Sequence, residues 1–532
     1  MRVTSTTRAV IVTMIAVSVV AAACGGDGSA SGSGDGNVID QGAEEAIQGQ
    51  VGASTAVSGP GSTTAAQPTD MDDWEQLWAE ERRAVVEEIK ANGWGLQADG
   101  TTVLGADGFR IDLGACAAGW SNTEGLTDTS IKFGATGAAS GTAADGYNIY
   151  RGQQAVLDHY GEKGAFADSA GKIRTVEFIG KDDAYDPART IPLVDELIDS
   201  DRVFMVQNQG SPSTLRVYDK LNQRCIPHPF AVTGHPAWGD PMLHPWTTGQ
   251  QLTYNIEALL WGRFLDDHIG ELGDGTVTVA ALAMSNDFGA VYDQAFREYL
   301  AQSPNKDRID YSVEWVEPQA VSAIDQMTTL AAKDPDMFIE MVTGVPCTYG
   351  INEAAQNGMK EQTPYKFVSY ACKNAAYVGT EAVGTAADGW WVMGGGIRDV
   401  TSPGEDGNAW IEWGRQVLED AGYDYKTSGY FGWGLISGWG LAQVIQIAGQ
   451  LDGGLTRVNL ITALRHTDLT NPGLVPGIKW NMRGGSDAYF VEGSEVARYD
   501  SAEDTFVQEG APIDLSGKSK VCAWDQSRAA CA

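Results

Sequence analysis

The sequence predicts an α/β protein of two lobes with a hinge and a central cleft, preceded by a small N-terminal appendage. Two observations lead to this prediction. Apolar strand-like segments alternate with helix-like segments from Ser130 onward, which is typical of parallel sheets covered by helices on both faces. The alternation also forms two successive arrays of similar length. Each array is long enough for a sheet of its own, and a cleft is expected between the two.

The composition excludes some classes of partner. The chain has 532 residues, of which 43% are hydrophobic, enough for substantial cores. It carries 70 acidic and 36 basic residues, a formal net charge of −34. Such a surface repels nucleic acids and anionic membranes. Because the sequence has no basic patch, no nucleic-acid partner is expected.

The N-terminal residues predict export. Arg2 and Arg8 precede an apolar run over residues 9–23 that is too short and too weakly hydrophobic for a membrane span. Residues 1–23 are therefore predicted to be a signal peptide. Residues 24–71 begin with glycine and serine and lack periodic apolar positions, so they are expected to form a flexible linker.

The first residue after the predicted signal peptide is Cys24. The run Ala21-Ala22-Ala23-Cys24 resembles the lipobox of bacterial lipoproteins, whose cysteine is diacylated through sulfur, although leucine is usual at the position of Ala21. A lipid on Cys24 would anchor the protein to the cell membrane on its extracytoplasmic face. Secretion without an anchor is the alternative.

The six cysteines that follow Cys24 agree with an oxidising compartment. Three disulfides are the simplest outcome, although six thiols allow fifteen pairings. A metal site is the rival interpretation, but the sequence has no Cys-x-x-Cys pair and its histidines are scattered. Sequence proximity favours Cys347–Cys372 and Cys522–Cys531, which leaves Cys116 with Cys225 by elimination.

Residues 72–129 are the predicted appendage. Apolar positions within residues 75–89 recur at helical spacing, and Asn92-Gly93 supplies an end to that helix. Short alternating strands then flank residues 105–108, which is a hairpin signal. The appendage is expected to pack on the main body and to hold no site.

The first lobe is predicted over residues 130–272. A strand at 131–133 leads into a loop of small residues, 134–141, and then into a helix from Thr142, with Asp145 completing a capping-box-like start. Open α/β sheets bind small molecules at such loops because helix amino termini converge there. Further strands are predicted at 173–180, 202–210 and 229–232, and further helices at 192–200, 211–221 and 254–270.

The second lobe, with the hinge crossovers, is predicted over residues 273–532. One helix from this half of the chain is expected to return to the first lobe. The predicted strands are 276–284, 311–316, 336–342 and 365–370, the helices 291–302, 323–333, 351–358 and 435–448, and the short tail strands 478–481, 487–491, 495–499 and 505–507.

Four segments carry a family resemblance by their order and spacing. They are FGATGAASG (133–141), DDAYDPARTIPLVDELIDSDRVFMV (182–206), the turn GSPST (210–214) and the loop NDFG (286–289) that opens the second lobe. Together they resemble the type I periplasmic binding proteins, and more narrowly the branched-chain amino acid (leucine/isoleucine/valine) binding group of ABC importers. The resemblance extends well over residues 130–449.

The resemblance implies a fold and a function. The fold is a pair of Rossmann-like lobes that close around one small molecule. The function is the solute-binding component of an ABC-type importer, which delivers a branched-chain amino acid-like molecule, carboxylate or amide to a permease driven by ATPase subunits. Ligand contacts made only in the closed state would drive closure. No covalent chemistry and no cofactor are required, so no enzyme activity is expected.

The resemblance also implies site residues. In the family, the hydroxyl turn of the first lobe and the loop after the next strand hold the ligand carboxylate. The first loop near Asp145 covers the ligand, and Phe288 stands where an aromatic residue is common. The expected ligand-binding set is Asp145, Gly210, Ser211, Ser213, Thr214, Gly234, His235, Trp238, Phe288, Thr343 and Ala371.

Two departures from the family pattern bear on the ligand. Amino acid binders usually have an alanine–threonine pair where this chain has Gly234-His235, and a histidine could donate to a carboxylate or amide and titrate near neutral pH. The glutamate that neutralises the ligand ammonium should follow the strand ending near Ser369, but residues 370–373 read YACK. An unpaired ammonium in a closed cleft is strongly unfavourable. A carboxylic acid, amide or other apolar organic ligand is therefore expected in place of an ordinary α-amino acid.

Two other function classes remain open. A sensory ligand-binding module would use the same fold and signal through a partner. A secreted hydrolase would need a nucleophile such as Ser211, for which His235 is the only candidate base, and the sequence has no GxSxG or HExxH motif. The glycine-rich run MGGGIRD (393–399) lacks GxGxxG spacing and a GK[ST] end, so nucleotide binding is not predicted.

Overall fold

The computed structural model describes residues 38–47 and 67–531. The predicted signal peptide and Cys24 lie outside the described residues, as does most of the predicted linker. The described part of that linker contains a helix, α1 (Gln41–Ile47), which differs from the prediction. Its buried side chains pack it against α7 (Tyr254–His268). A helix of seven residues is stabilised by such a contact more than by its own sequence, so periodicity did not reveal it.

The first lobe is built on a four-stranded sheet with strand order β5-β6-β4-β7. Strand β4 (Ser130–Gly137) lies parallel to β6 on one side and to β7 on the other, so both of its backbone edges are hydrogen-bonded. It therefore extends through residues 134–137, where a loop was predicted. Small residues suffice there because Leu197 and Val203 fill the space above Gly134. The other strands of this lobe are β5 (Phe166–Ala167), β6 (Ile173–Asp182), β7 (Met205–Asn208), β8 (His228–Ala231) and β9 (Thr247–Gly249).

Helix α3 (Asn148–Glu162) begins later than predicted. A 3-10 turn, η3 (Ala144–Tyr147), precedes it and has no side-chain cap. The hydroxyl of Thr142 instead donates a hydrogen bond of 2.5 Å to the carbonyl of Pro318 in the second lobe. The residue that looks like a helix cap in the sequence therefore joins the two lobes. The other helices that follow in this lobe are α4 (Pro187–Asp199), α5 (Ser211–Leu215) and α6 (Tyr218–Gln223).

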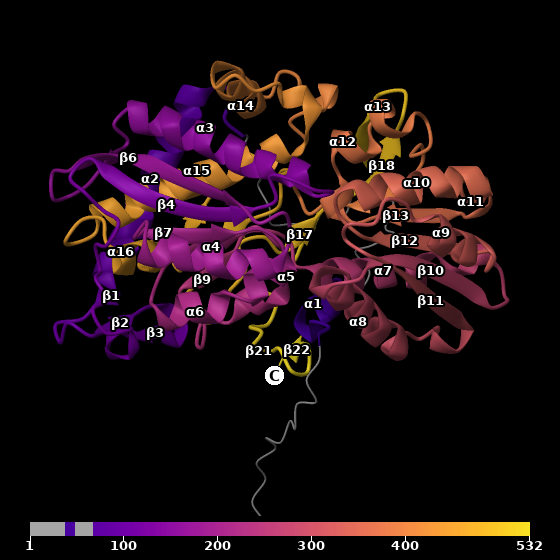
Figure 1. The fold of residues 1–532 in the computed structure, drawn as a ribbon, viewed down its shortest axis with the longest axis horizontal. Helices are drawn as coiled ribbons and strands as arrows, with labels where there is room; N and C mark the ends of the chain where they lie inside the picture. Colours follow the sequence, from indigo (N-terminus) through magenta and orange to yellow (C-terminus); the bar gives the residue numbers. More distant parts are fainter. Residues whose placement is uncertain (1–37, 48–66, 532) are drawn as a thin grey trace, which may run out of the picture. The chain divides into compact units, whose positions relative to one another are not determined.

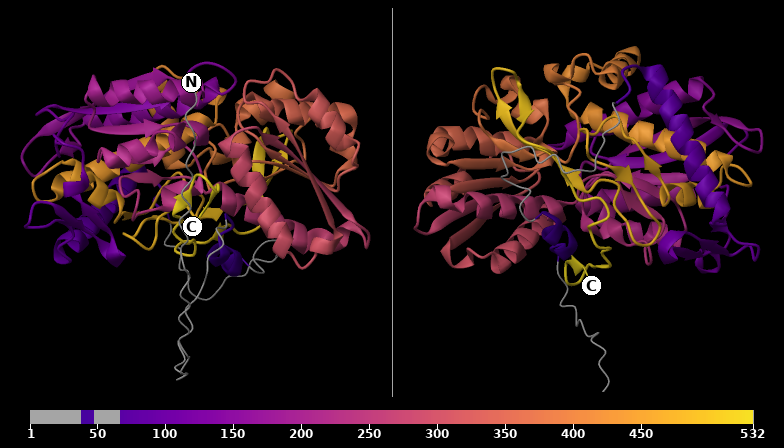
Figure 2. Two further views of the ribbon diagram at one scale, coloured as in Figure 1. Left: turned by 60° about the horizontal axis from the view of Figure 1, so that its bottom comes forward. Right: turned by 180° about the vertical axis from the view of Figure 1, so that it is seen from behind.

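Helix α15 (Tyr430–Gln450) returns from the C-terminal part of the chain and lies on α3 (Figure 1). The two backbones approach closely, since a Cβ atom on Gly434 would come within 2.8 Å of the Cα of Gly152. Helix α2 (Met71–Ala91) of the appendage also packs on α15, as the view from behind in Figure 2 shows. The first lobe thus combines early, middle and late segments of the sequence. The appendage also holds β1 (Gly95–Leu96), β2 (Thr102–Leu104) and β3 (Arg110–Asp112).

The second lobe is built on a seven-stranded sheet with strand order β11-β10-β12-β13-β14-β18-β19. The strands from β10 to β14 are parallel, whereas β18 and β19 are antiparallel additions. Helix α7 packs on α8 and β14 of this lobe. The chain therefore crosses between lobes before Tyr254, and the predicted boundary after residue 272 is too late. The strands are β10 (Val277–Met284), β11 (Ile309–Val316), β12 (Met337–Met341), β13 (Tyr365–Val368), β14 (Trp391–Met393), β18 (Val496–Asp500) and β19 (Thr505–Gln508).

The helices of the second lobe lie along this sheet, as expected for a parallel array. Their bounds are α8 (Asp287–Gln302), α9 (Ile324–Ala331), α10 (Val345–Asn357), α11 (Met359–Gln362), α12 (Ala375–Val378) and α13 (Thr380–Val383).

The tail of the chain forms short strands and turns. The predicted strand at residues 487–491 is absent except for an isolated bridge at Asp487, and Tyr489 and Phe490 are instead buried as apolar anchors without a ladder. The remaining elements are α14 (Ala409–Asp420), α16 (Arg457–Leu464), β15 (Asp468–Leu469), β16 (Trp480–Asn481), β17 (Gly493–Ser494), β20 (Ile513–Asp514), β21 (Trp524–Asp525) and β22 (Ala530–Cys531).

The predicted disulfide pairing is confirmed. All three bonds have Cα–Cα distances between 5.0 and 5.9 Å. The bonds are Cys116–Cys225, Cys347–Cys372 and Cys522–Cys531.

Within residues 38–47 and 67–531, none of the helices combines the length and apolar character that crossing a bilayer requires.

Candidate ligand-binding site

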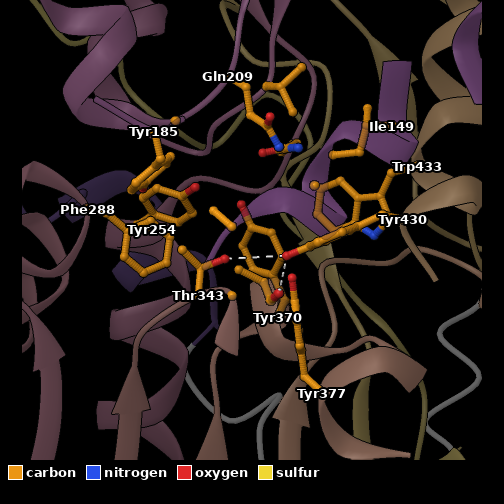
Figure 3. Close-up of a pocket in the computed structure, with 17 residues that line it drawn as sticks. Ile149, Tyr185, Gln209, Tyr254, Phe288, Thr343, Tyr370, Tyr377, Tyr430 and Trp433 are labelled. Atoms are coloured by element: carbon orange, nitrogen blue, oxygen red, sulfur yellow. Dashed lines mark hydrogen bonds between the residues drawn. The ribbon is translucent and has the colours of Figure 1, made fainter. Parts of the chain in front are cut away.

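A small cavity lies where the two lobes meet, at the carboxyl ends of their central strands (Figure 3). Its volume is about 50 Å³, room for a few water molecules. Both lobes and the crossover between them supply its wall. The lining residues are Ala143, Gly146, Ile149, Tyr185, Gln209, Gly210, Val232, Gln251, Tyr254, Phe288, Thr343, Gly344, Tyr370, Ala371, Tyr377, Tyr430 and Trp433.

The wall of the cavity is aromatic and uncharged. None of the described residues that line it carries a formal charge, and five of them are tyrosines. The Tyr430 hydroxyl, from the start of α15, donates to the carbonyl of Ala371 (2.7 Å) and lies 3.4 Å from the Thr343 hydroxyl. Tyr370 donates to the carbonyl of Leu252 (2.7 Å). These bonds fix two rings across the boundary between the lobes.

Two hydroxyls in the wall are left for a ligand. The side-chain oxygens of Tyr185 in the first lobe and Tyr377 in the second are buried and have no hydrogen-bond partner among the described residues. A buried polar group without a partner is unfavourable by about 1–3 kcal/mol. A ligand with hydrogen-bonding atoms at both ends would satisfy both groups.

Glu257 and Lys373 lie next to residues of the wall but do not line the cavity. Glu257 lies behind Tyr370, whose backbone N–H donates to it at 2.8 Å, and it also accepts a hydrogen bond from Tyr292. Burial raises the pKa of Glu257 well above its usual range, which favours the neutral form of this carboxyl group. Lys373 is held by Glu495 (2.5 Å) and by a backbone carbonyl. The residues that line the cavity therefore carry no formal charge themselves.

Hydrogen bonds beside the cavity hold the lobes together. Asp145 in η3 accepts a hydrogen bond from Asn374 of the second lobe (2.7 Å) and one from Ser428 (2.7 Å). The backbone N–H of Val345, at the start of α10, donates to the carbonyl of Thr142 (3.1 Å). These contacts join residues from opposite lobes, so the structure is a closed form.

A family model described as periplasmic binding protein matches residues 130–503. The chain belongs to the periplasmic binding protein family. No curated protein matches this sequence. Solved structures with the same fold include a possible leucine/isoleucine/valine-binding protein from Rhodopirellula baltica SH 1, with 19% identity and a TM-score of 0.58 over 74% of this chain and 98% of the other.

Two further solved structures resemble this periplasmic binding protein. One, from Thermus thermophilus, is described as a branched chain amino acid ABC transporter with bound valine; it has 14% identity and a TM-score of 0.61 over 74% of this chain and 98% of its own. The other is an ABC transporter solute binding protein from R. palustris in complex with 4-hydroxybenzoate, with 15% identity and a TM-score of 0.59 over 74% and 98%. At these identities the similarity concerns the fold.

The structure brings four of the predicted site residues to the cavity wall: Gly210, Phe288, Thr343 and Ala371. Phe288 packs edge-to-face on Tyr254, with ring centroids 4.7 Å apart. The residues that follow strand β13 contribute no carboxylate to the wall. Ala371 lines the cavity at that position. Asp145 does not line the cavity, although its neighbour Gly146 does.

The predicted hydroxyl turn lies behind the wall. Ser211 is fully buried and its hydroxyl lies 2.8 Å from that of Thr233. Ser213 lies 2.9 Å from the Thr190 hydroxyl, and Thr214 has a buried hydroxyl without a partner in the described chain. Only Gly210, which precedes this turn, reaches the cavity.

The expectation for His235 is wrong. Its ring is 1% exposed, packs against Trp524 with centroids 4.4 Å apart, and does not reach the cavity. Burial lowers its pKa to about 3, so it does not titrate near neutral pH. Trp238 is likewise buried and donates to a backbone carbonyl, and Gly234 lies behind Tyr370. The Ser211 hydroxyl pairs with Thr233 and not with the ring of His235.

Most of the wall was missed from the sequence. The expected ligand-binding set does not contain Tyr185, Gln209, Tyr377, Tyr430 or Trp433, all of which line the cavity. Each follows the end of a strand or lies in the first turn of a helix, and that position is the signal that could have identified them. Within the described ranges, no group of three or more His, Cys, Asp or Glu side chains is arranged to hold a metal ion.

Proposed function

We propose that this chain is the extracytoplasmic solute-binding component of an ABC-type importer. It captures a small organic molecule between its lobes and delivers it to a permease with its ATPase subunits. The observation that carries the proposal is the closed, uncharged cavity between two lobes of a periplasmic binding protein. Similar structures described as parts of ABC transporters support the importer role.

The charge of the cavity wall decides the ligand class. An α-ammonium group would find no carboxylate among the lining residues, and burying an unpaired charge is strongly unfavourable. The ligand is therefore an amide, another apolar molecule, or a carboxylic acid whose carboxylate accepts hydrogen bonds from the unpartnered hydroxyls of Tyr185 and Tyr377. Tyr254, Phe288, Tyr370 and Trp433 offer ring faces, which favours a ring-shaped body with a hydrogen-bonding group, as in the 4-hydroxybenzoate held by the R. palustris protein.

Closure couples binding to delivery. The ligand would contact Tyr185 and Gly210 in one lobe and Thr343 and Tyr377 in the other. In an open form the ligand would contact only one lobe. The ligand therefore binds the closed form more tightly than the open form, and this difference in affinity shifts the population toward the closed form. The permease would then recognise the closed pair of lobes.

The membrane attachment is part of the proposal. Cys24 would carry the lipid after removal of residues 1–23 and hold the protein outside the cytoplasmic membrane. Metabolic labelling with a radioactive fatty acid should mark the wild-type protein and not Cys24→Ser. Labelling of both proteins alike would contradict the anchor.

The ligand proposal is tested directly by mass spectrometry of the small molecule that co-purifies with the secreted domain. A thermal-shift panel of carboxylic acids and amides, with leucine and valine as the matched amino acids, checks the class. We expect stabilisation by ring-bearing acids or amides and none by the amino acids. Stabilisation by leucine or valine alone would overturn the proposed ligand class. A separate experiment distinguishes transport from sensing: a strain that lacks the protein should lose uptake of the ligand if the protein serves an importer.

A further inference from the structure

Tyr185 separates the cavity from a second hollow that also lies between the lobes. This outer groove has a volume of about 490 Å³, against about 50 Å³ for the cavity. Tyr185 is the one residue that lines both, within the described chain. The outer groove is lined by Tyr185, Pro187, Pro212, Arg216, Ser285, Asn286, Asp287, Ala290, Trp315 and Pro318.

The backbone at Tyr185 is held in an unfavourable conformation. Ala184 and Tyr185 have φ values of 52° and 61°, in the left-handed region that residues other than glycine seldom adopt. The carboxylates of Asp182 and Asp183 stabilise it by accepting the backbone N–H groups of these two residues at 2.9 and 3.0 Å. Asp183 is itself buried and accepts a hydrogen bond from Thr190 (2.8 Å). Strain of this kind concentrates at binding sites.

The ring of Tyr185 packs against the backbone of Gly210. A Cβ atom on Gly210 would come within 2.3 Å of the Tyr185 Cε2, so only glycine leaves room for the ring. The strained backbone at Ala184 and Tyr185, together with the lack of a side chain on Gly210, places the ring between the cavity and the outer groove. Its position is therefore fixed by the backbone on one side and by Gly210 on the other.

The outer groove is suited to an apolar chain. Trp315, which is 38% exposed, and the rings of Pro212 and Pro318 provide apolar surface in it. Arg216 and Asp287 face each other across the lobes at 3.5 Å and neutralise each other's charge. The amide nitrogen of Asn286 is buried there without a partner among described residues.

We propose that Tyr185 is a specificity-determining residue that limits the length of the ligand. The inference rests on the proposed function and names the ligand class more closely: compact molecules held between the lobes on the cavity side of Tyr185. The ring ends the cavity, so a ligand with a longer alkyl chain is rejected. Without the ring, the cavity and the outer groove join, and the alkyl chain lies along Trp315.

The test compares variants against 4-alkylbenzoic acids and their amides with alkyl chains of zero to five carbons, by isothermal titration calorimetry. The wild type should bind the short members and lose affinity beyond a cut-off. In Tyr185→Ala the cut-off should disappear, and each further methylene should tighten binding about four-fold. Tyr185→Phe should keep the wild-type cut-off. Tyr185→Ala with Trp315→Ala should lose most of the gain per methylene.

A second variant guards against a folding defect. Tyr185→Gly removes the ring and suits the positive φ, so its folding should be retained. An identical chain-length cut-off in the wild type and in Tyr185→Gly would overturn this inference alone. Binding of no member of the series by the wild type or by any variant would contradict the proposed ligand class, and this inference with it.

Discussion

The carboxylate of Asp145 in the first lobe accepts a hydrogen bond of 2.7 Å from the side-chain amide of Asn374 in the second. The same carboxylate accepts a bond of 2.8 Å from Asn148, which lies in its own lobe. Burial raises the pKa of Asp145, although the bonds from Ser428, Asn374 and Asn148 oppose that shift. The bond to Asn374 exists only while the lobes are closed, whereas the bond to Asn148 does not depend on closure.

This difference gives a matched pair of variants. Asn374→Asp places a second carboxyl group against Asp145 in the closed form, and two adjacent carboxylates cannot both ionise. Closure then requires a bound proton, so ligand affinity should fall by up to about ten-fold per unit as pH rises through the neutral range. Asn148→Asp creates the same pair within one lobe and should add no such pH dependence. Calorimetric titrations from pH 6 to 8.5 measure ligand affinity in both variants. Equal pH profiles would show that the contact between Asp145 and residue 374 does not depend on closure.

The disulfide Cys347–Cys372 joins the start of α10 to the loop after β13, and both segments contribute to the cavity wall through Gly344 and Ala371. Replacing both cysteines by alanine should lower the free energy of unfolding by about 3 kcal/mol, from the chain entropy of its loop, and should weaken ligand binding. The control is the double alanine variant of Cys522–Cys531, which closes a shorter loop and does not line the cavity. Denaturant titration and calorimetry measure both effects. Unchanged affinity in the first variant would show that the bond does not position the wall.

Glu340 lies in the core of the second lobe on β12, and neither of its side-chain oxygens has a partner in the described chain. Burial raises its pKa well above the usual value of 4.5. The folded protein therefore keeps a proton that the unfolded chain releases above that value, so the stability falls as pH rises, by about 1.4 kcal/mol per unit until the folded-state carboxyl ionises. Glu340→Gln should remove this slope.

Urea titrations at pH 4.5, 6 and 8 measure the effect of Glu340→Gln. The difference in unfolding free energy between variant and wild type should grow with pH in favour of the variant. Glu361→Gln on the exposed surface is the control and should leave the slope unchanged. A constant difference at the three pH values would contradict the assignment of a protonated Glu340.

The hydroxyl of Tyr377 has no partner in the free protein as described. Tyr377→Phe should therefore leave the stability of the ligand-free protein unchanged or slightly higher, while ligand affinity falls by about three- to ten-fold from the loss of one hydrogen bond. Tyr430→Phe is the contrasting variant, because that hydroxyl donates to the carbonyl of Ala371. It should lower stability by about 1 kcal/mol. The prediction fails if Tyr377→Phe loses stability without losing affinity.

The alternation of strands and helices was readable from the sequence because parallel strands are continuous apolar runs. Strand β10 (Val277–Met284) lies close to its predicted limits, and helix α8 (Asp287–Gln302) ends where predicted but begins four residues earlier. The disulfides were readable because two of the three pairs are near in sequence. The lobe boundary could not be predicted, because the sequence of α7 would suit a helix on either sheet. Only its packing on α8 and β14 assigns it to the second lobe.

The candidate site was predicted only in part, for a physical reason. Gly210 and Phe288 lie where a strand is followed by a helix, a position that faces the cleft, and the family resemblance implied both. His235 stands in an equivalent loop, but a tryptophan from the far C-terminus, Trp524, covers it. Tyr430 reaches the cavity only because α15 returns to the first lobe. Contacts between segments so distant in the chain leave no local pattern in the sequence.

The return of α15 to α3 has a consequence for biosynthesis. The apolar face of α3 is covered by a helix that begins at Tyr430, so the first lobe cannot be completed until most of the chain has been synthesised. Until then that face remains exposed to solvent and open to aggregation. A fragment that ends before Tyr430 should therefore not fold into a stable half.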